Sequence, residues 1–459
     1  MKRIGIIGGG FAGTMTAVHL IEQGTRPLEL ILVDNSKALN KGIAYHPYSR
    51  NQLLNVVAAK MSAYPGKPDH FLDWLCARDE FEGHDRSLVA QAFLPRYLYG
   101  EYLAHIWSGA LATCRQKDIS ITVIQDTVCD LDVTESGVSM HLAGGGVIHA
   151  GTCILATGNQ LPGNPAIKNE SFFKSPLYFQ NPWNIEPVTG IPGSLPVLII
   201  GNGLTMVDTV TGLLENSFKG TILSVSPNGF NILPHRHNWL KYTEISGELS
   251  GKMSLYDLVR LLHKHIKKVR SLGISAGPVI DAIRPFTQTI WGNFTAEEKR
   301  VFLSRFRHLW GVARHRIPLT VHDRIQQLRI EGKLLVIAGK IVDISESANS
   351  AIVEYYDKKA GAIQKTAVAR VINCTGPETD FSKLEHNLLN SALRKGIITQ
   401  DAFRLGIHTN PATFEVFSAE GIPQPALLTL GGNLKGELWE STAVPELRVQ
   451  AERMARLLL

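Results

Sequence analysis

The stretch KRIGIIGGGFAGTMTAVHLIEQG, residues 2–24, decides the fold of this chain. An apolar run that predicts a buried strand leads into the glycine pattern G-x-G-x-x-G, after which apolar residues recur at helical spacing. A second strand, LELILVD, ends at Asp34, roughly 20 residues after the glycines, where a carboxylate can accept from ribose hydroxyls. This order of strand, turn, helix, strand and acid predicts a βαβ unit that binds a dinucleotide.

Each residue of the glycine turn has its own task in such a unit. Gly8 and Gly10 let the turn form and let a pyrophosphate approach the backbone, while Gly13 lets the helix pack on the strand. The first helical residues, Phe11 and Ala12, offer backbone N–H groups to phosphates. The alternative is a glycine-rich turn without a ligand, and the flanking strands and acid argue against it.

A second copy of the pattern, LPVLIIGNGLTMVDTVTGLL, occupies residues 195–214, and the strand TILSVSP follows it. This copy keeps Gly201 and Gly203, the two glycines that admit a pyrophosphate, and Thr205 adds a hydroxyl near the helix start. Met206 stands where the first copy has its third glycine, so we expect a wider gap between helix and strand here. The copy is interpreted as a working, weaker nicotinamide nucleotide site.

Each copy is also trailed by an apolar strand with a small-residue turn, ILATG ending at Gly158 and VINCTG at 371–376. Two dinucleotide units in one chain are typical of flavoproteins that hold FAD in one unit and a nicotinamide nucleotide in the other. The predicted FAD-binding domain spans 1–162 and 376–459, and the predicted NAD(P)H-binding domain is inserted at 163–375, with a helical insertion at about 230–340.

Composition indicates a globular protein and excludes several classes of function. With 459 residues, 44% of them hydrophobic, the chain is long enough for two or three domains. A net charge of +6 with 19% charged residues is mild, so it fits nucleotide phosphates and does not indicate nucleic acid. The five cysteines are scattered without C-x-x-C, which argues against a disulfide framework, a zinc site and a dithiol redox centre.

The sequence shows no targeting or membrane segment and no metal site. It lacks a signal-peptide pattern and an apolar segment of roughly 20 residues, so we expect a cytoplasmic protein that does not contact a membrane. The insertion contains the pairs His235/His237 and His263/His265, but no carboxylate accompanies them, and positions two apart on a helix do not share a face. We predict no metal there. The oligomeric state stays open.

Nine segments together resemble the bacterial FAD/NAD(P)-binding family related to flavin-containing monooxygenases and to lysine and ornithine N-hydroxylases. They are GIIGGGFAG, KGIAYHP, LLNVVAAKMSAYPGKPDHFLDWL, FLPRYLYGEYL, ILATGN, LIIGNGLTMVD, FRHLWGVARHRIP, VINCTGP and KGELWESTAVPELRVQA. The resemblance implies an α/β fold of two Rossmann-like three-layer domains. It also implies FAD at the first glycine turn and NADPH around the second.

The resemblance suggests further contacts to FAD. Asn55 would lie beside the flavin as the catalytic residue, and its alternative is a loop asparagine that satisfies local backbone. Arg96 would reach the pyrophosphate or pair with an acid such as Glu101. Val128 would bind adenine through its backbone amide and carbonyl; the alternative is a strand valine in the core.

The segment LGGNLKGELWESTAVPELR, residues 430–448, resembles the one that brings backbone amides and a helix N-terminus to the pyrimidine end of the flavin. Gly432, Asn433 and Thr442 are its candidate contacts. Asn433 replaces the usual aspartate, which puts the contact to the ribityl chain in doubt. Ser441 and Thr442 have the alternative role of capping the last helix.

The cofactor preference and the reaction follow from these features. The strand at 221–226 ends without an acid, which favours NADPH over NADH, although Pro227 and Asn228 replace the basic residue usually expected there. The leading hypothesis is a monooxygenase that oxygenates a small amine or sulfur substrate with molecular oxygen through a flavin C4a-hydroperoxide. The alternatives are an NAD(P)H-dependent flavin reductase and an FAD-bound redox sensor or interaction protein with little turnover.

Overall fold

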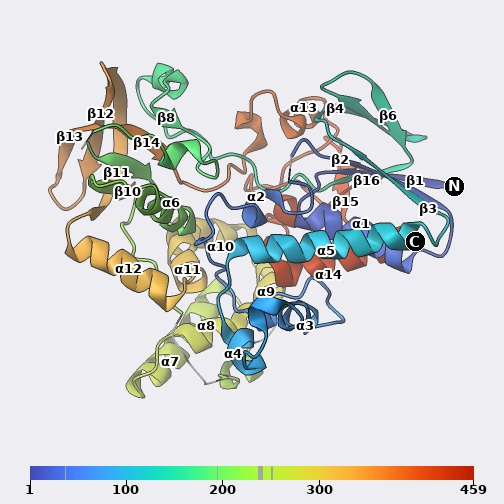
Figure 1. The fold of residues 1–459 in the computed structure, drawn as a ribbon, viewed down its shortest axis with the longest axis horizontal. Helices are drawn as coiled ribbons and strands as arrows, with labels where there is room; N and C mark the ends of the chain where they lie inside the picture. Colours follow the sequence, from blue (N-terminus) through green and yellow to red (C-terminus); the bar gives the residue numbers. More distant parts are fainter. Residues whose placement is uncertain (37, 194, 236–240, 250–251) are drawn as a thin grey trace. The chain divides into compact units, whose positions relative to one another are not determined.

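The chain folds into two units in the computed structural model, which describes residues 1–36, 38–193, 195–235, 241–249 and 252–459. Unit 1 comprises Met1–Gln160 and Thr379–Leu459, and unit 2 comprises Leu161–Glu378. The chain therefore leaves unit 1 once, completes unit 2 as a single segment, and returns; the colours of Figure 1 follow this path.

The first glycine turn belongs to the central six-stranded sheet of unit 1, whose order is β15-β16-β7-β1-β2-β3. In that order the strands are β15 (Glu415–Phe417), β16 (Pro423–Thr429), β7 (Thr152–Leu155), β1 (Lys2–Ile7), β2 (Leu28–Val33) and β3 (Ile119–Ile124). All neighbours are parallel except β15 and β16. Strands follow on both sides of β1, which lies inside the sheet, so the sheet is doubly wound, as the first βαβ unit predicts.

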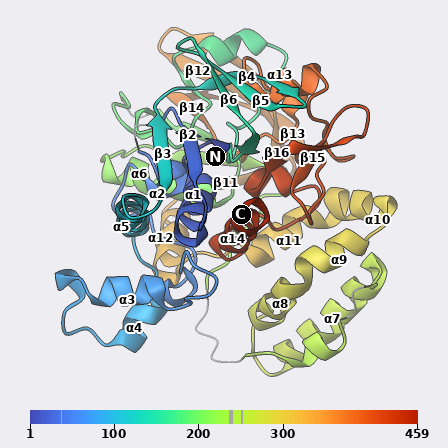
Figure 2. The ribbon, with the colours of Figure 1, turned by 90° about the vertical axis from the view of Figure 1, so that its right-hand side faces the viewer.

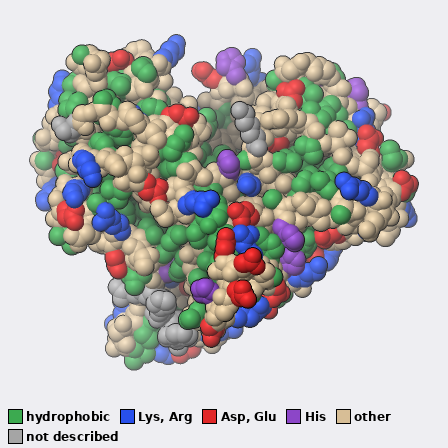
Figure 3. Space-filling view, in the orientation of Figure 1, with side chains coloured by type: hydrophobic (Ala, Val, Ile, Leu, Met, Phe, Trp, Pro, Cys, Tyr) green, Lys and Arg blue, Asp and Glu red, His purple; other side chains and the backbone are tan. Residues whose placement is uncertain are grey.

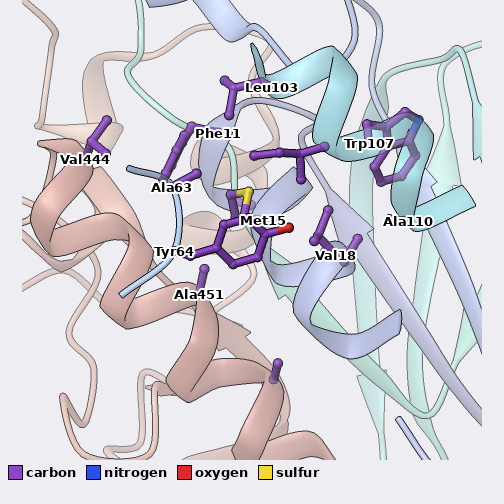
Figure 4. Packing of buried hydrophobic residues seen from close by; sticks show 14 of the residues in the cluster. Phe11, Met15, Val18, Ala63, Tyr64, Leu103, Trp107, Ala110, Val444 and Ala451 are labelled. Atoms are coloured by element: carbon purple, nitrogen blue, oxygen red, sulfur yellow. The ribbon is translucent and has the colours of Figure 1, made fainter. Parts of the chain in front are cut away.

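Helix α1 (Phe11–Gln23) lies on one face of this sheet and packs against α5 (Arg96–Cys114) and α14 (Val444–Leu458). Figure 2 shows α1 between the other two helices. In Figure 4, Met15 of α1 lies close to Tyr64 and Ala451, and all three side chains are buried. Each large apolar side chain buried here contributes about 1.5–3 kcal/mol, so α1 is held from several sides.

The opposite face of the sheet is covered by a three-stranded antiparallel sheet, β4 (Val128–Thr134), β5 (Gly137–Leu142) and β6 (Val147–Ala150). The contact is close, because a Cβ on Gly5 would lie 2.5 Å from the Met140 methyl group. Helix α13 (Leu388–Arg394) packs beside β4. Unit 1 therefore has three layers. Its shorter helices are α2 (Gly42–Tyr45), α3 (His70–Cys76) and α4 (Arg86–Gln91).

Unit 2 repeats the plan around a seven-stranded sheet of order β13-β12-β11-β10-β9-β14-β8. These strands are β13 (Ala362–Val368), β12 (Ser350–Asp357), β11 (Leu334–Ser347), β10 (Ile222–Ser226), β9 (Val197–Ile200), β14 (Arg370–Asn373) and β8 (Tyr178–Phe179). The strands from β11 to β8 are parallel, while β12 and β13 form an antiparallel extension. Helix α6 (Leu204–Glu215) connects β9 to β10.

The insertion of unit 2 is helical. It consists of α7 (Leu255–Ser271), α8 (Gly277–Ile283), α9 (Thr287–Asn293), α10 (Ala296–Val301), a π-helical turn at Phe302–Phe306, α11 (Arg307–Arg314) and α12 (Leu319–Ile330). Figure 2 shows α7 to α11 gathered in one group. Residues 296–314 form α10, the π-helical turn and α11 in succession.

The surface fits the mild net charge. Lys and Arg side chains alternate with Asp and Glu side chains over the face drawn in Figure 3, so the positive charge is not gathered into one patch there. Among the described residues, no helix is long and apolar enough to cross a membrane.

Candidate cofactor-binding sites

The glycine turn after β1 is built for a close approach of helix and strand. Gly8 has φ +106°, and a Cβ there would lie 2.3 Å from the carbonyl oxygen of Ala156. A Cβ on Gly13 would lie 1.9 Å from the carbonyl oxygen of Gly8, so only glycine fits. Gly10 differs, because its nearest neighbour would be the Cα of Gly42 at 3.7 Å. Gly8 and Gly13 thus allow close packing of the backbone, and Gly10 leaves open space beside it.

The space at Gly10 lies at the N-terminus of α1. Gly10 is the N-cap residue, no side chain caps the helix, and the first turn contains no acid. The backbone N–H groups of the first turn, which includes Phe11 and Ala12, have no intrahelical acceptor and carry the positive end of the helix dipole. This arrangement suits a pyrophosphate.

Asp34 is fixed at the end of β2 by two backbone donors. Its Oδ2 accepts from the N–H of Gly9 and its Oδ1 from the N–H of Ser36 at 2.6 Å. Next to it, Asn35 donates to the hydroxyl of Thr127 at 3.0 Å, which brings the start of β4 to the same place. Val128 is buried there. The structure therefore brings the predicted ribose and adenine contacts together.

The C-terminal segment reaches the turn after β7. A Cβ on Gly432 would lie 3.8 Å from both the Gly158 carbonyl oxygen and the Thr442 methyl group. A Cβ on Gly431, which has φ +74°, would lie 3.9 Å from the Cβ of Ala12. Residues from three distant parts of the chain thus meet around the start of α1, and small residues keep the space open. The residues present fit FAD.

Asn433 turns inward. It is 2% exposed, and its amide donates to the hydroxyls of Thr429 at 3.0 Å and Thr157 at 3.1 Å. The side chain therefore joins the ends of β7 and β16, and a contact from Asn433 to a cofactor would have to come from its backbone. This explains physically why an amide replaces the usual aspartate.

The capping role predicted as an alternative for Ser441 and Thr442 is wrong. Helix α14 begins after Ala443, which is its N-cap, and no side chain caps it. Pro445 has no N–H and the N–H of Glu446 donates to Ala443 O at 3.0 Å, so the start of α14 offers fewer backbone donors than the start of α1. Thr442 is proposed to contact the cofactor on the strength of its place beside Gly432.

The loop that contains Asn55 is hydrogen-bonded to the segment around Arg96. The N–H of Leu54 donates to Leu94 O at 2.8 Å, and Arg96 Nε donates to Leu53 O at 3.0 Å, so the loop around Asn55 is fastened to the start of α5. Asn55 itself is half-buried.

Glu101, the acid named as an example of a partner for Arg96, pairs with Arg78 at 2.9 Å. Both predicted roles of Arg96, the contact to the pyrophosphate and the pairing with an acid, stay predictions.

The second glycine turn in unit 2 matches the first in its backbone. Gly201 has φ +114°, and a Cβ there would lie 2.4 Å from Cys374 O. This matches the first turn, where a Cβ on Gly8 would come equally close to Ala156 O. Gly203 is the N-cap of α6, without side-chain cap or nearby acid, and a Cβ on it would meet nothing within 4 Å. Thr205 lies in the first turn of α6 and is half-buried. This second uncapped helix start fits a nicotinamide dinucleotide.

Met206 shows how the second turn differs. Its side chain is 1% exposed, so it is accommodated at the position where a Cβ is impossible in the first turn. Helix α6 therefore has more room beside its strand than α1 has. The first helical hydrogen bond is also longer, 3.3 Å from Val207 N to Gly203 O against 2.9 Å from Thr14 N to Gly10 O.

Sequence reasoning missed a basic residue near the end of β10. Arg329 of α12 donates through Nη1 to Asn231 Oδ1 at 2.7 Å, in the loop that follows β10. About 100 residues separate the two partners, so no local pattern indicates the contact.

One histidine of the predicted pairs, His265, has structural partners. His265 is buried, with Nδ1 2.5 Å from the Tyr242 hydroxyl and Nε2 3.0 Å from Glu248. His237, from the other predicted pair, lies outside the described residues. Within the described ranges no group of three His, Cys, Asp or Glu side chains is arranged to hold a metal.

Comparisons with known proteins agree with this geometry. Residues 5–160 match the family model described as FAD-NAD(P)-binding. Uncharacterized protein YdhS of Escherichia coli strain K12 is 26% identical over 195 residues, which are 40% of this chain and 34% of that protein. The match thus spans about a third of the length of that relative.

Two solved structures resemble the whole chain. The ornithine hydroxylase of Pseudomonas aeruginosa has a TM-score of 0.66 at 15% identity, covering 100% of this chain and 99% of that one. The L-lysine 6-monooxygenase of Pseudomonas syringae has a TM-score of 0.65 at 14% identity, with the same coverage. At such identities the likeness shows the fold.

These findings confirm the predicted α/β fold with Rossmann-like units and the predicted cofactor classes, FAD and NAD(P). Residues 5–160, which belong to unit 1, therefore match the FAD-NAD(P)-binding family, and the chain as a whole has the fold of the ornithine hydroxylase and the lysine monooxygenase that it resembles.

Proposed function

We propose that the protein is an FAD-dependent, NADPH-using monooxygenase that oxygenates a small nucleophilic substrate at an amine nitrogen or a sulfur. One observation carries the proposal. The chain has an uncapped glycine turn in each unit, within a fold that follows an ornithine hydroxylase and a lysine monooxygenase over their whole lengths.

The cysteines favour oxygen over a disulfide as the electron acceptor. All five are free. Cys153 and Cys374 are fully buried, and burial raises the pKa of each thiol to about 12, so neither forms the thiolate that disulfide exchange requires. A flavin reductase that works through a cysteine pair is therefore disfavoured.

The protein's own part in the reaction is to hold, orient and exclude water. FAD, reduced by NADPH, would supply the chemistry with oxygen. In the proposal the N–H groups at the start of α1 bind the pyrophosphate, and the start of α14 stabilises negative charge at the pyrimidine end of the flavin. Asn55 donates a hydrogen bond beside the reacting atoms. No acid–base pair is required for such a reaction.

Coupling between NADPH and product tests the function. Purified flavoprotein is incubated with NADPH, oxygen and one of L-ornithine, L-lysine, an alkyl diamine or a thioether, and hydroxylated product and hydrogen peroxide are measured. We expect one substrate to yield nearly one product per NADPH. Peroxide alone with every substrate, or faster turnover without oxygen on an artificial acceptor, would favour the reductase. A flavin that NADPH does not reduce within minutes would favour the sensor.

Replacement of Asn55 tests its role. Asn55→Ala should keep its FAD and its rate of flavin reduction, while product per NADPH falls about tenfold and peroxide rises, the size expected for one lost hydrogen bond to a charged group. Asn51→Ala is the matched control, an exposed asparagine at the start of the same loop. Equal coupling in both variants would remove Asn55 from the site.

We also propose that Arg329 sets the preference for NADPH. The end of β10 has no acid, and Arg329 reaches the loop that follows it, where a guanidinium can bind a 2′-phosphate. Arg329→Gln should raise the KM for NADPH about tenfold and leave the KM for NADH unchanged. Arg324→Gln, an exposed residue of the same helix, is the control. An equal loss with both nucleotides would show that Arg329 only supports the loop.

A further inference from the structure

A cavity of about 400 Å³ lies inside the helical insertion of unit 2. Its walls are the end of α7, the loop that leads into α8, α8 itself, the end of α11 with the residues that follow it, and the loop after β10 at 233–234. This volume is within the range of about 300–1,000 Å³ that small-molecule sites occupy. Every residue of its lining belongs to unit 2, and the predicted dinucleotide contacts Gly201, Gly203 and Thr205 are not among them.

Arg316 is the buried charge of this cavity. It lines the wall and is 7% exposed. Its backbone is fixed by its neighbour, since Ile317 N donates to Leu233 O at 3.1 Å and Ile317 O accepts from His235 N at 2.7 Å. These backbone hydrogen bonds fix the position from which the Arg316 side chain extends.

The donors of Arg316 are mostly unused. Nη2 donates to Asp281, and this is its one hydrogen bond to a described residue. Nε is buried without an acceptor in the described part of the chain. A guanidinium carries five N–H donors, and leaving buried donors unpaired is costly. Asp281 is half-exposed, so it only partly neutralises the cation.

The remaining lining selects the kind of anion. Leu233, Pro234, Ile274, Ile280 and Ala313 make most of the wall apolar. Arg270, at the end of α7, adds a second positive charge at an exposed position. The unused donors of Arg316 in an apolar wall match a carboxylate on an apolar body. A phosphate, which carries up to two charges and more acceptors, would leave acceptors unpaired here.

We propose that this cavity binds a small organic carboxylate with an apolar body, with the carboxylate on Arg316 and the body against the apolar wall. The lining of this binding site contains none of the proposed dinucleotide contacts, and the proposal does not depend on the reaction of the flavin. It provides the insertion with a function of its own, as a substrate or effector site.

Calorimetric titration of the FAD-loaded protein with hexanoate tests the proposal. Saturating NADP⁺ is present, so that the carboxylate does not report on the dinucleotide site. We expect one hexanoate per chain, and hexanamide, which has the same shape without the charge, should bind about tenfold more weakly or worse. Arg316→Gln should lose the preference for the carboxylate. Arg300→Gln, an exposed arginine of α10, should keep it.

A second variant covers the case in which Arg316→Gln does not fold. Ala313→Phe keeps every charge and places a phenyl ring in the cavity, so hexanoate should bind more weakly while FAD content and melting temperature stay near wild type. The proposal is overturned if wild type does not bind hexanoate, if hexanamide binds equally well, or if folded Ala313→Phe binds hexanoate as tightly as wild type.

Discussion

At the scale of single residues, the glycines of the first turn have separable roles. Gly13→Ala should destabilise unit 1 by about 1–3 kcal/mol and abolish FAD binding, because its Cβ meets Gly8 O. Gly10→Ala should leave stability within about 0.5 kcal/mol of wild type, because its Cβ meets nothing close. The added methyl group should nevertheless weaken FAD binding about tenfold, since it occupies the space for the pyrophosphate.

Urea unfolding of the apoprotein and titration with FAD measure the two effects. Gly109→Ala is the matched control, since Gly109 is an exposed position of α5 with open space around it and should lose neither property. FAD binding by Gly10→Ala at wild-type strength would mean that the pyrophosphate does not lie at the start of α1.

Residues differ in how far the sequence predicts them. Gly8, Gly13 and Asp34 are predictable because their spacing is local and each has one physical reason. Asn433 is not, because its inward hydrogen bonds depend on β7 and β16, which come from distant parts of the chain. Arg329 and Arg316 are missed for the same reason, since their partners Asn231 and Asp281 are remote in sequence.

At the scale of elements, the start of α6 decides whether unit 2 binds a dinucleotide. Gly203 has extended backbone angles, φ −104° and ψ −164°, which suit a capping aspartate. Gly203→Asp should therefore stabilise α6 by about 0.5–1 kcal/mol. It should also weaken NADPH binding at least about tenfold, because its carboxylate would face the phosphates.

Thermal melting and NADPH titration separate these outcomes. Gly203→Ser caps the helix without a charge and should show the stabilisation with a smaller loss of affinity. Unchanged NADPH affinity in Gly203→Asp would place the phosphates elsewhere.

The βαβ elements were predictable, whereas the layers that cover them were not. β1, α1 and β2, and likewise β9, α6 and β10, have apolar runs that match their periods. The strands β4, β5 and β6 are short and mixed in pattern, and they become a sheet only through contacts such as that of Met140 with Gly5. The room for Met206 beside α6 was likewise not predictable from the sequence in detail, since it depends on how the helix packs on its strand.

At the scale of the whole molecule, His19 should contribute to unfolding in acid. It lies in α1, 2% exposed, and burial, with smaller effects from Arg456 and Lys67, lowers its pKa from 6.5 to about 4. Between these values the unfolded chain binds a proton that the folded protein does not, so stability is lost as pH falls. The loss amounts to about 3 kcal/mol between pH 6.5 and pH 4.

Unfolding free energies measured from pH 7 to pH 4 test this. His19→Leu should have a shallower dependence on pH, with the remainder due to groups such as His70, whose pKa burial also lowers. His263→Gln, at an exposed position of α7, should follow wild type. Parallel curves for wild type and His19→Leu would contradict the assignment.

The interleaving of the two units imposes an order of assembly during translation. The space beside α1 is bounded by residues 431–442, and α1 packs against α14, so this part of unit 1 stays incomplete until the ribosome has released those residues. Unit 2, a continuous segment ending at Glu378, can fold earlier on the nascent chain. The proposed FAD contacts at 431–442 can therefore form only at the end of synthesis, after residues 1–160 and unit 2 have been made.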